Sequence, residues 1–277
     1  MASWRYDGIA LPLRLGTASA VLLHAGLHLK RLAQPRALWP YLLIAVGVAA
    51  GGLGLVKLAL SDPSAPIEYF RKFLLRGEAL CALGLATAAV RADADAGALQ
   101  YWLLRPRAAV ALPIGRWLAV VAAVTGLGWL MALSVLGATA GTILMPPGEF
   151  VVRMLLSVPL AAMAYSAIFL WIASTVRAAA ATGLLWLVLV DLGLASLSTT
   201  VGLIAPSQYL GTFIAGAPDA SLIDTLKARV GAAAGLATAG TATATWQHVT
   251  GAAAGLLLLA GAGLAGAVWR FRGNPPD

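Results

Sequence analysis

Six stretches of the chain are long and apolar enough to cross the hydrocarbon core of a bilayer as helices. They cover about 38–60, 73–90, 114–140, 150–175, 178–204 and 247–270. A helix rises about 1.5 Å per residue, so roughly 20 apolar residues span about 30 Å of hydrocarbon. Backbone polar groups in lipid must be satisfied within their own segment, which favours helices for runs of this length. We therefore expect an all-α, polytopic membrane protein with six transmembrane helices.

The composition supports a membrane protein and argues against a nucleic-acid-binding one. Of the 277 residues, 60% are hydrophobic and 11% are charged, whereas soluble domains carry about 25% charged residues. The net charge is +8, but the basic residues lie in short clusters between apolar runs. Such clusters are typical of topology signals and of contacts to anionic lipid headgroups. No linker divides the chain, so residues 1–277 are interpreted as a single membrane domain with lipid as a partner.

The distribution of basic residues predicts the orientation. With the N-terminus inside, 12 Lys and Arg residues fall on the inner side of the six spans and seven on the outer side. An excess of positive charge marks the cytoplasmic face. We expect a multi-pass protein of the cytoplasmic (inner) membrane, with both termini and the polar segment 91–113 in the cytoplasm.

Residues 16–34 have the pattern of an amphipathic helix at the membrane surface, and Pro35 ends that pattern. The apolar face comprises Ala18, Val21, Leu22, Ala25, Leu29 and Leu32. The polar face comprises His24, His28, Lys30, Arg31 and Gln34. His24 and His28 have metal-ligand spacing, but no carboxylate or cysteine ligand accompanies them nearby. We interpret them as residues of the polar face and predict no metal site.

The polar segment between the second and third spans contains the pattern of a short cytoplasmic helix at 96–105. Asp93 and Asp95 are placed to cap its start, and Pro106 stops it after Arg105. Leu99, Trp102 and Leu103 share one bulky face of that helix. Such a face fits a groove on a partner protein, or it rests on lipid headgroups. The residues alone favour neither use.

The run from Leu85 to Leu118 resembles the conserved stretch of ABC-transporter permeases of the type-2 export family. That family includes drug, lipid and polysaccharide exporters and the permeases of gliding-motility and copper-site-maturation systems. An acidic pair, Gly97-Ala98-Leu99, Leu103-Leu104, Pro106 and Gly115-Arg116 follow in the family's order, with Ala98 in place of the usual Thr. The resemblance implies that 16–34 is an elbow helix and 96–105 a coupling helix that docks on a separate ATPase subunit. The residues implied to contact the ATPase are Asp95, Leu99, Tyr101, Trp102, Leu103 and Arg105.

The same resemblance implies that the chain works together with separate protein subunits. The sequence contains no phosphate-binding loop of the G-x-x-x-x-G-K-[ST] type, and no catalytic constellation is evident. We therefore expect no enzyme activity and no cofactor in this chain, with ATP and Mg held by the ATPase subunit. A second permease subunit, identical or different, is also implied. The segment 205–246 would cap the exit on the outer side and is a possible contact for an outer partner.

Asp191 lies in the middle of the fifth apolar stretch and is expected to face the bundle interior, because a carboxylate in lipid is costly. Ser198 lies on nearly the same face. Either the two residues line a transport path or a subunit interface, or Asp191 is a structural carboxylate. Glu78 lies nearer the end of a span, where snorkelling or local pairing explains it.

The functional prediction is the permease subunit of an ABC-type exporter that moves an unidentified substrate outward. One alternative is an ion-coupled secondary carrier in which Asp191, with or without Glu78, takes up and releases the ion. The other is a membrane assembly protein that recruits a cytoplasmic partner through the Trp102 helix.

Overall fold

The computed structural model describes residues 17–58, 74–95, 108–140, 148–193, 204–215 and 246–273. The helices are α1 Thr17–Leu32, α2 Pro35–Leu58, α4 Leu75–Asp95, α6 Ala108–Thr139, α7 Gly148–Thr175, α8 Ala179–Trp186, α10 Pro206–Ala215 and α12 Trp246–Gly273, with a π-helix, η2 Leu187–Gly193, directly after α8. Across these ranges the secondary structure is helical and contains no strand. The all-α prediction is confirmed.

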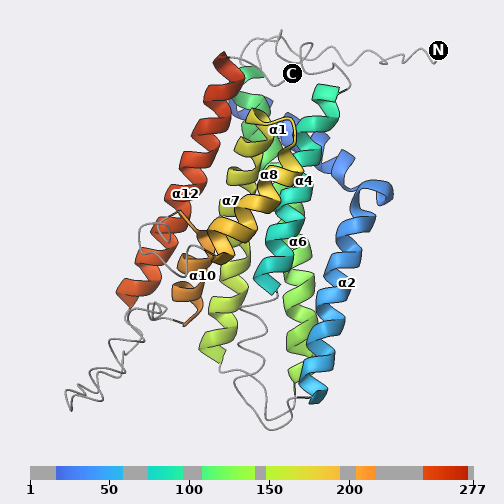
Figure 1. Cartoon of the computed structure of the whole chain (residues 1–277), viewed down its shortest axis with the longest axis vertical. Helices are drawn as coiled ribbons and strands as arrows, with labels where there is room; N and C mark the ends of the chain where they lie inside the picture. Colours follow the sequence, from blue (N-terminus) through green and yellow to red (C-terminus); the bar gives the residue numbers. More distant parts are fainter. Residues whose placement is uncertain are drawn as a thin grey trace.

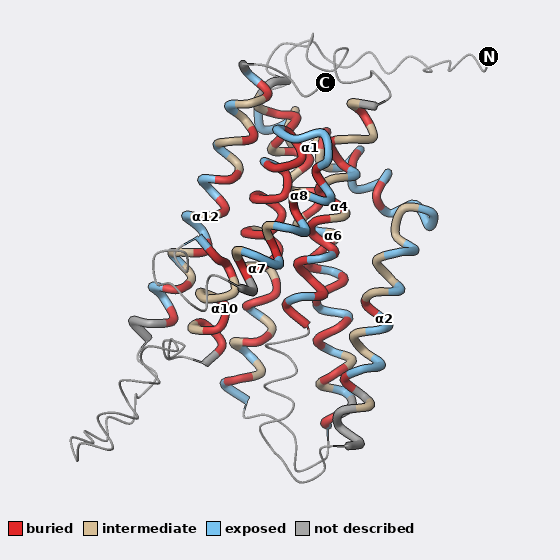
Figure 2. The backbone as a smooth tube through the Cα atoms, viewed as in Figure 1, coloured by how far each residue is buried: buried red, intermediate tan, exposed pale blue. Residues whose placement is uncertain are grey.

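The long helices lie side by side in a bundle (Figure 1). α2 and α6 run away from the end that carries α1, whereas α4, α7 and α12 run towards it. We call this end, at the top of Figure 1, the α1 end. α7 is central and contacts α4, α6, α8, α10 and α12. Its central position explains why most of its residues are buried, whereas α12 is exposed along one side (Figure 2).

Within the described ranges, three helices are long and apolar enough to cross a membrane: Val110–Gly137, Gly148–Thr175 and Val249–Arg272. Large apolar side chains cover the outside of the bundle, among them Leu133, Leu156, Leu257 and Leu258. Such a surface suits lipid and would be unusual in water. A multi-pass membrane protein is the architecture that these helices fit.

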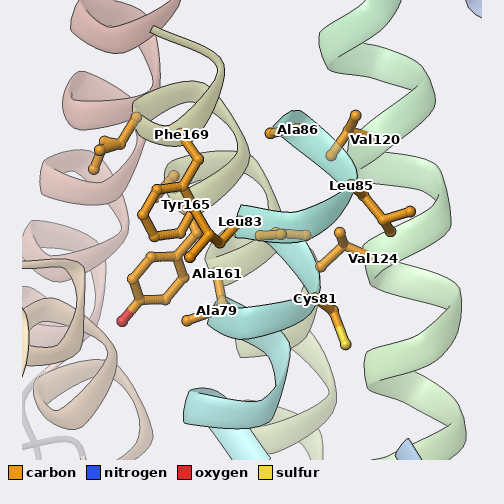
Figure 3. Packing of buried hydrophobic residues seen from close by; sticks show 14 of the residues in the cluster. Ala79, Cys81, Leu83, Leu85, Ala86, Val120, Val124, Ala161, Tyr165 and Phe169 are labelled. Atoms are coloured by element: carbon orange, nitrogen blue, oxygen red, sulfur yellow. The ribbon is translucent and has the colours of Figure 1, made fainter. Parts of the chain in front are cut away.

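The interior is built from small side chains and a few large ones at the contact of α4, α6 and α7 (Figure 3). Leu85 points from α4 towards Val124 of α6, and Leu83 points towards α7. On α7, the rings of Tyr165 and Phe169 are stacked with centroids 6.0 Å apart. Alanines fill much of the remaining interface, which lets the helix axes approach closely.

A proline inside α7 explains one contact to α6. Pro159 has no N–H group, so the carbonyl of Leu155 loses its partner one turn earlier. The indole Nε1 of Trp129 donates a hydrogen bond to that carbonyl at 3.1 Å. Because a backbone group in lipid needs a hydrogen-bond partner, this bond replaces the one that the Leu155 carbonyl loses at the proline.

Several boundaries differ from the sequence prediction. α4 continues through Asp95 and α6 begins at Ala108, so the second and third spans are longer than predicted. Of the span predicted at 178–204, the structure describes α8 and η2, and the helix changes from α to π geometry between them. This described part is too short to cross a membrane by itself. α10 was not expected as a helix. The predicted coupling helix 96–105, Ser198 and the segment 216–245 lie outside the described residues.

Candidate functional site

Three charged side chains from three helices meet at the α1 end of the bundle. Arg116 of α6 is fully buried and its Nη2 lies 2.6 Å from Oδ2 of Asp93 on α4. The other oxygen of Asp93 pairs with Nη1 of Arg31 on α1, whose side chain is half exposed. One carboxylate therefore joins α1, α4 and α6. Since burying a charge is costly, the Arg116–Asp93 pair is stable only while both partners are present.

His28 of α1 completes this group, which we call the Asp93 cluster: His28, Arg31, Asp93 and Arg116. Nε of Arg116 donates a hydrogen bond to Nε2 of His28 at 3.3 Å. That acceptor role requires a neutral imidazole with its proton on Nδ1. Burial and, next, the charge of Arg116 lower the pKa of His28 to about 4, so the ring is neutral at physiological pH. The guanidinium carbon of Arg116 also lies 5.7 Å from the ring centroid of Phe271 on α12.

Gly115 explains how α1 comes so close to α6. A Cβ atom at this position would lie 2.6 Å from Cβ of His24 and 2.9 Å from the carbonyl oxygen of Val21. Any larger residue would therefore push the α1 backbone away. The Gly115-Arg116 pair has two functions: the glycine admits α1, and the arginine holds α1 and α4 through Asp93 and His28.

The position of the Asp93 cluster relates it to the predicted coupling segment. α4 ends at Asp95 and α6 begins at Ala108, so the Arg116–Asp93 pair joins the two helices that precede and follow segment 96–107 in the chain, and Arg31 joins Asp93 to α1. Asp95 is the last residue of α4, with its side chain outside the described part. The other predicted ATPase contacts, Leu99, Tyr101, Trp102, Leu103 and Arg105, also lie outside it.

Two sequence predictions about this end of the molecule were wrong. His24 and His28 do not face water; both are buried in the contact with α6, while Leu22 from the predicted apolar face is 68% exposed. His28 contacts Arg116 and His24 packs at Gly115, both on α6, and the pattern of one helix cannot reveal these contacts. Asp93, predicted in the polar segment just before helix 96–105, instead lies in the last turn of α4 and pairs with two arginines, and the helix that it was predicted to cap lies outside the described residues. The sequence signal for the buried face is the spacing of His24, His28 and Leu32, which are four residues apart and share one side of the helix.

Asp191 faces the bundle interior, as predicted, and is 3% exposed. Its Oδ2 accepts a hydrogen bond from the Tyr165 hydroxyl at 2.7 Å, and its Oδ1 accepts one from the backbone N–H of Ser207 at 3.1 Å. The Ser207 hydroxyl donates to the backbone carbonyl of Asp191 at 2.9 Å. Ser207 lies in the first turn of α10, where a carboxylate is favourable. These bonds fit the structural interpretation of Asp191, which anchors α10 to η2 and α7.

Glu78 was predicted to lie near the end of a span and to snorkel or pair locally, but the structure places it in the interior. It is fully buried in the first turns of α4, and neither carboxyl oxygen has a hydrogen-bond partner among the described residues. A Cβ on Gly128 of α6 would lie 3.2 Å from its carboxyl carbon and 2.6 Å from a methyl carbon of Val158 on α7. The carboxyl group therefore sits where α4, α6 and α7 meet. This burial could not be predicted from the neighbouring residues, because Glu78 is flanked by Arg76 and small residues.

In the described ranges, no three His, Cys, Asp or Glu side chains lie close enough together to hold a metal ion. A comparison with known protein-family models gives no match for the chain, and a comparison with curated proteins gives none either. Functional inference therefore rests on the residues and their geometry.

Proposed function

We propose that the chain is the membrane-spanning permease subunit of an ABC-type exporter, which couples ATP hydrolysis in a separate subunit to outward transport. The supporting observation is the Asp93 cluster at Gly115. Asp93, Gly115 and Arg116 belong to the stretch that resembles type-2 export permeases, and together they join α1 to α4 and α6, the two helices that flank segment 96–107 in the chain. This is the geometry that a coupling element needs on its membrane side.

The proposed coupling follows from that geometry. A force applied to segment 96–105 by an ATPase would reach α4 at Asp95 and α6 at Ala108. Because the Asp93 cluster holds α4 and α6 to each other and to α1, these three helices would move as one unit rather than bend separately. Rigid movement of one group of helices against another is a common way to alternate access. α7 and α12 would belong to the other group.

The proposal includes the finer topology. Six crossings would be formed by α2, α4, α6, α7, the α8–η2 region and α12, with α1 as the elbow helix at the cytoplasmic surface. Exposed Trp39 and Trp269 lie on the helix ends nearest α1, a position that suits the membrane interface. A second permease subunit would complete the pathway, and ATP with Mg would bind to the ATPase pair.

Among the alternatives, the carrier hypothesis rested mainly on Asp191. Its three hydrogen-bonded contacts to α7 and α10 favour an anchoring role over ion exchange. The assembly-protein alternative uses the same Trp102 surface and differs in the partner, so one experiment separates it from the permease.

The test is co-purification of the tagged full chain from its native host in mild detergent. Wild type is compared with Trp102→Asp, which removes the proposed anchor, and with the matched control Trp102→Phe. We expect a stoichiometric ATPase with wild type and with Trp102→Phe, and at least a tenfold loss with Trp102→Asp, which corresponds to about 1.4 kcal/mol. Recovery of folded wild type without any ATPase would refute the permease and favour an assembly role.

A further inference from the structure

Glu78 is a buried carboxyl group that the proposed coupling mechanism does not use. It lies beside Gly128, which is nine residues from one end of the membrane-crossing stretch Val110–Gly137 and 18 residues from the other. At about 1.5 Å per residue, this places the carboxyl well inside the hydrocarbon layer if α6 spans it. An unpaired ion at such a depth is costly.

No partner nearby offsets that cost within the described residues. Neither oxygen of Glu78 has a hydrogen bond, although the backbone of Ala162 on α7 lies close to it without ordinary hydrogen-bond geometry. The titratable groups that interact electrostatically with Glu78 are Cys81 on α4 itself and Tyr165 on α7, whose hydroxyl donates to Asp191, and none of the three supplies positive charge. Arg76 precedes Glu78 on α4 but is exposed.

Two more buried polar groups continue from Glu78 towards the α1 end. Thr125 lies one helical turn from Gly128 on α6, and Ser166 lies one turn from Ala162 on α7. A turn rises about 5 Å, and both steps lead in the same direction because α6 and α7 are antiparallel. Both hydroxyl oxygens are buried and have no hydrogen-bond partner among the residues that the structure describes. We call Glu78, Thr125 and Ser166 the Glu78 seam.

Unsatisfied buried polar groups in a row require an explanation, and bound water or an ion is the usual one. A metal ion would need several oxygen ligands, whereas the seam offers one carboxyl and two hydroxyls. A proton needs a single carboxyl group. It also removes the charge, so the glutamic acid can remain among Val158 and Gly128.

We propose that Glu78 is a proton-binding site in the core of the bundle and that Thr125 and Ser166 form the hydrated route to it from the α1 end. In the packed arrangement the carboxyl keeps its proton. When α4 and α6 separate from α7, water reaches the group and the proton leaves to that water. The proposal does not require an ATPase, so it stands or fails independently of the permease assignment.

The first test is infrared difference spectroscopy of the full chain in liposomes at neutral pH. We expect the C=O band of a protonated carboxylic acid in wild type and its loss in Glu78→Gln, which keeps the size and removes the acid. The matched control is Glu149→Gln, an exposed residue, which should retain the band. A wild-type spectrum without a protonated acid, or a band unchanged in Glu78→Gln, would overturn the proton site.

The second test uses exchange into D₂O and does not depend on the folding of Glu78→Gln. If the seam is the route, Thr125→Val and Ser166→Ala should each slow the deuterium shift of this band at least threefold. Thr212→Val, on α10 away from the seam, should leave the rate unchanged. Exchange at the wild-type rate in both seam variants would contradict the proposed route.

Discussion

Removing the carboxylate of Asp93 should destabilise the protein strongly, because it leaves the buried guanidinium of Arg116 without its counter-charge. Arg116 is fully buried and its bond to Asp93 is 2.6 Å long. Breaking a buried pair by removing one partner costs about 3–5 kcal/mol. The second pair, to the half-exposed Arg31, adds at most about 1 kcal/mol. We therefore predict that Asp93→Ala lowers the unfolding free energy by about 3–5 kcal/mol.

The protein contains its own probe for this measurement. Cys81 is the single cysteine and is fully buried, so a thiol-reactive dye labels it when the bundle opens. The unfolding free energies of Asp93→Ala, Arg116→Met and the double variant form a double-mutant cycle. The double variant should be less destabilised than the sum of the two single variants, because it buries no unpaired charge. A cost of Asp93→Ala below about 1 kcal/mol, or strict additivity, would refute the buried-pair argument.

Three further predictions concern neighbouring contacts. Stability should fall by about 3 kcal/mol as the pH drops from 6.5 to 4, because the unfolded state protonates His28 while the folded state does not; His28→Gln should flatten this slope in tryptophan-fluorescence unfolding curves. Gly115→Leu should displace α1 and raise the proteolysis rate at its ends, whereas Gly126→Leu, a site with open space, should match wild type. Tyr165→Phe should cost about 1–3 kcal/mol in the thiol-labelling assay, since Asp191 loses a buried hydrogen bond, and an unchanged stability would exclude that bond.

Helix content was predictable from the sequence because apolar length alone fixes it in a membrane protein. α1, α2, α7 and α12 lie close to their predicted ranges. The interior position of Asp191 was also predictable, since a carboxylate far from both ends of an apolar run has no other place to go.

The partners of the polar groups were not predictable, because each depends on residues far apart in the chain. Asp93 and Arg116 are separated by 23 residues, and His28 and Arg116 by 88. A one-helix pattern therefore assigned His28 to water and missed the buried guanidinium that it contacts. Glu78 was misplaced for the same reason, since the side chains that cover it come from α6 and α7.

The most direct test of the central claim measures whether nucleotide binding moves α1, α4 and α6 as a unit against α7 and α12. Spin labels at the exposed positions Leu22 on α1 and Leu258 on α12 report that movement in a Cys81→Ala background, and labels at Leu22 and Leu133 report the rigidity of the α1–α6 unit. In the complex with the ATPase, we predict that ATP changes the first distance and leaves the second unchanged. A complex that hydrolyses ATP while the Leu22–Leu258 distance stays constant would contradict the account.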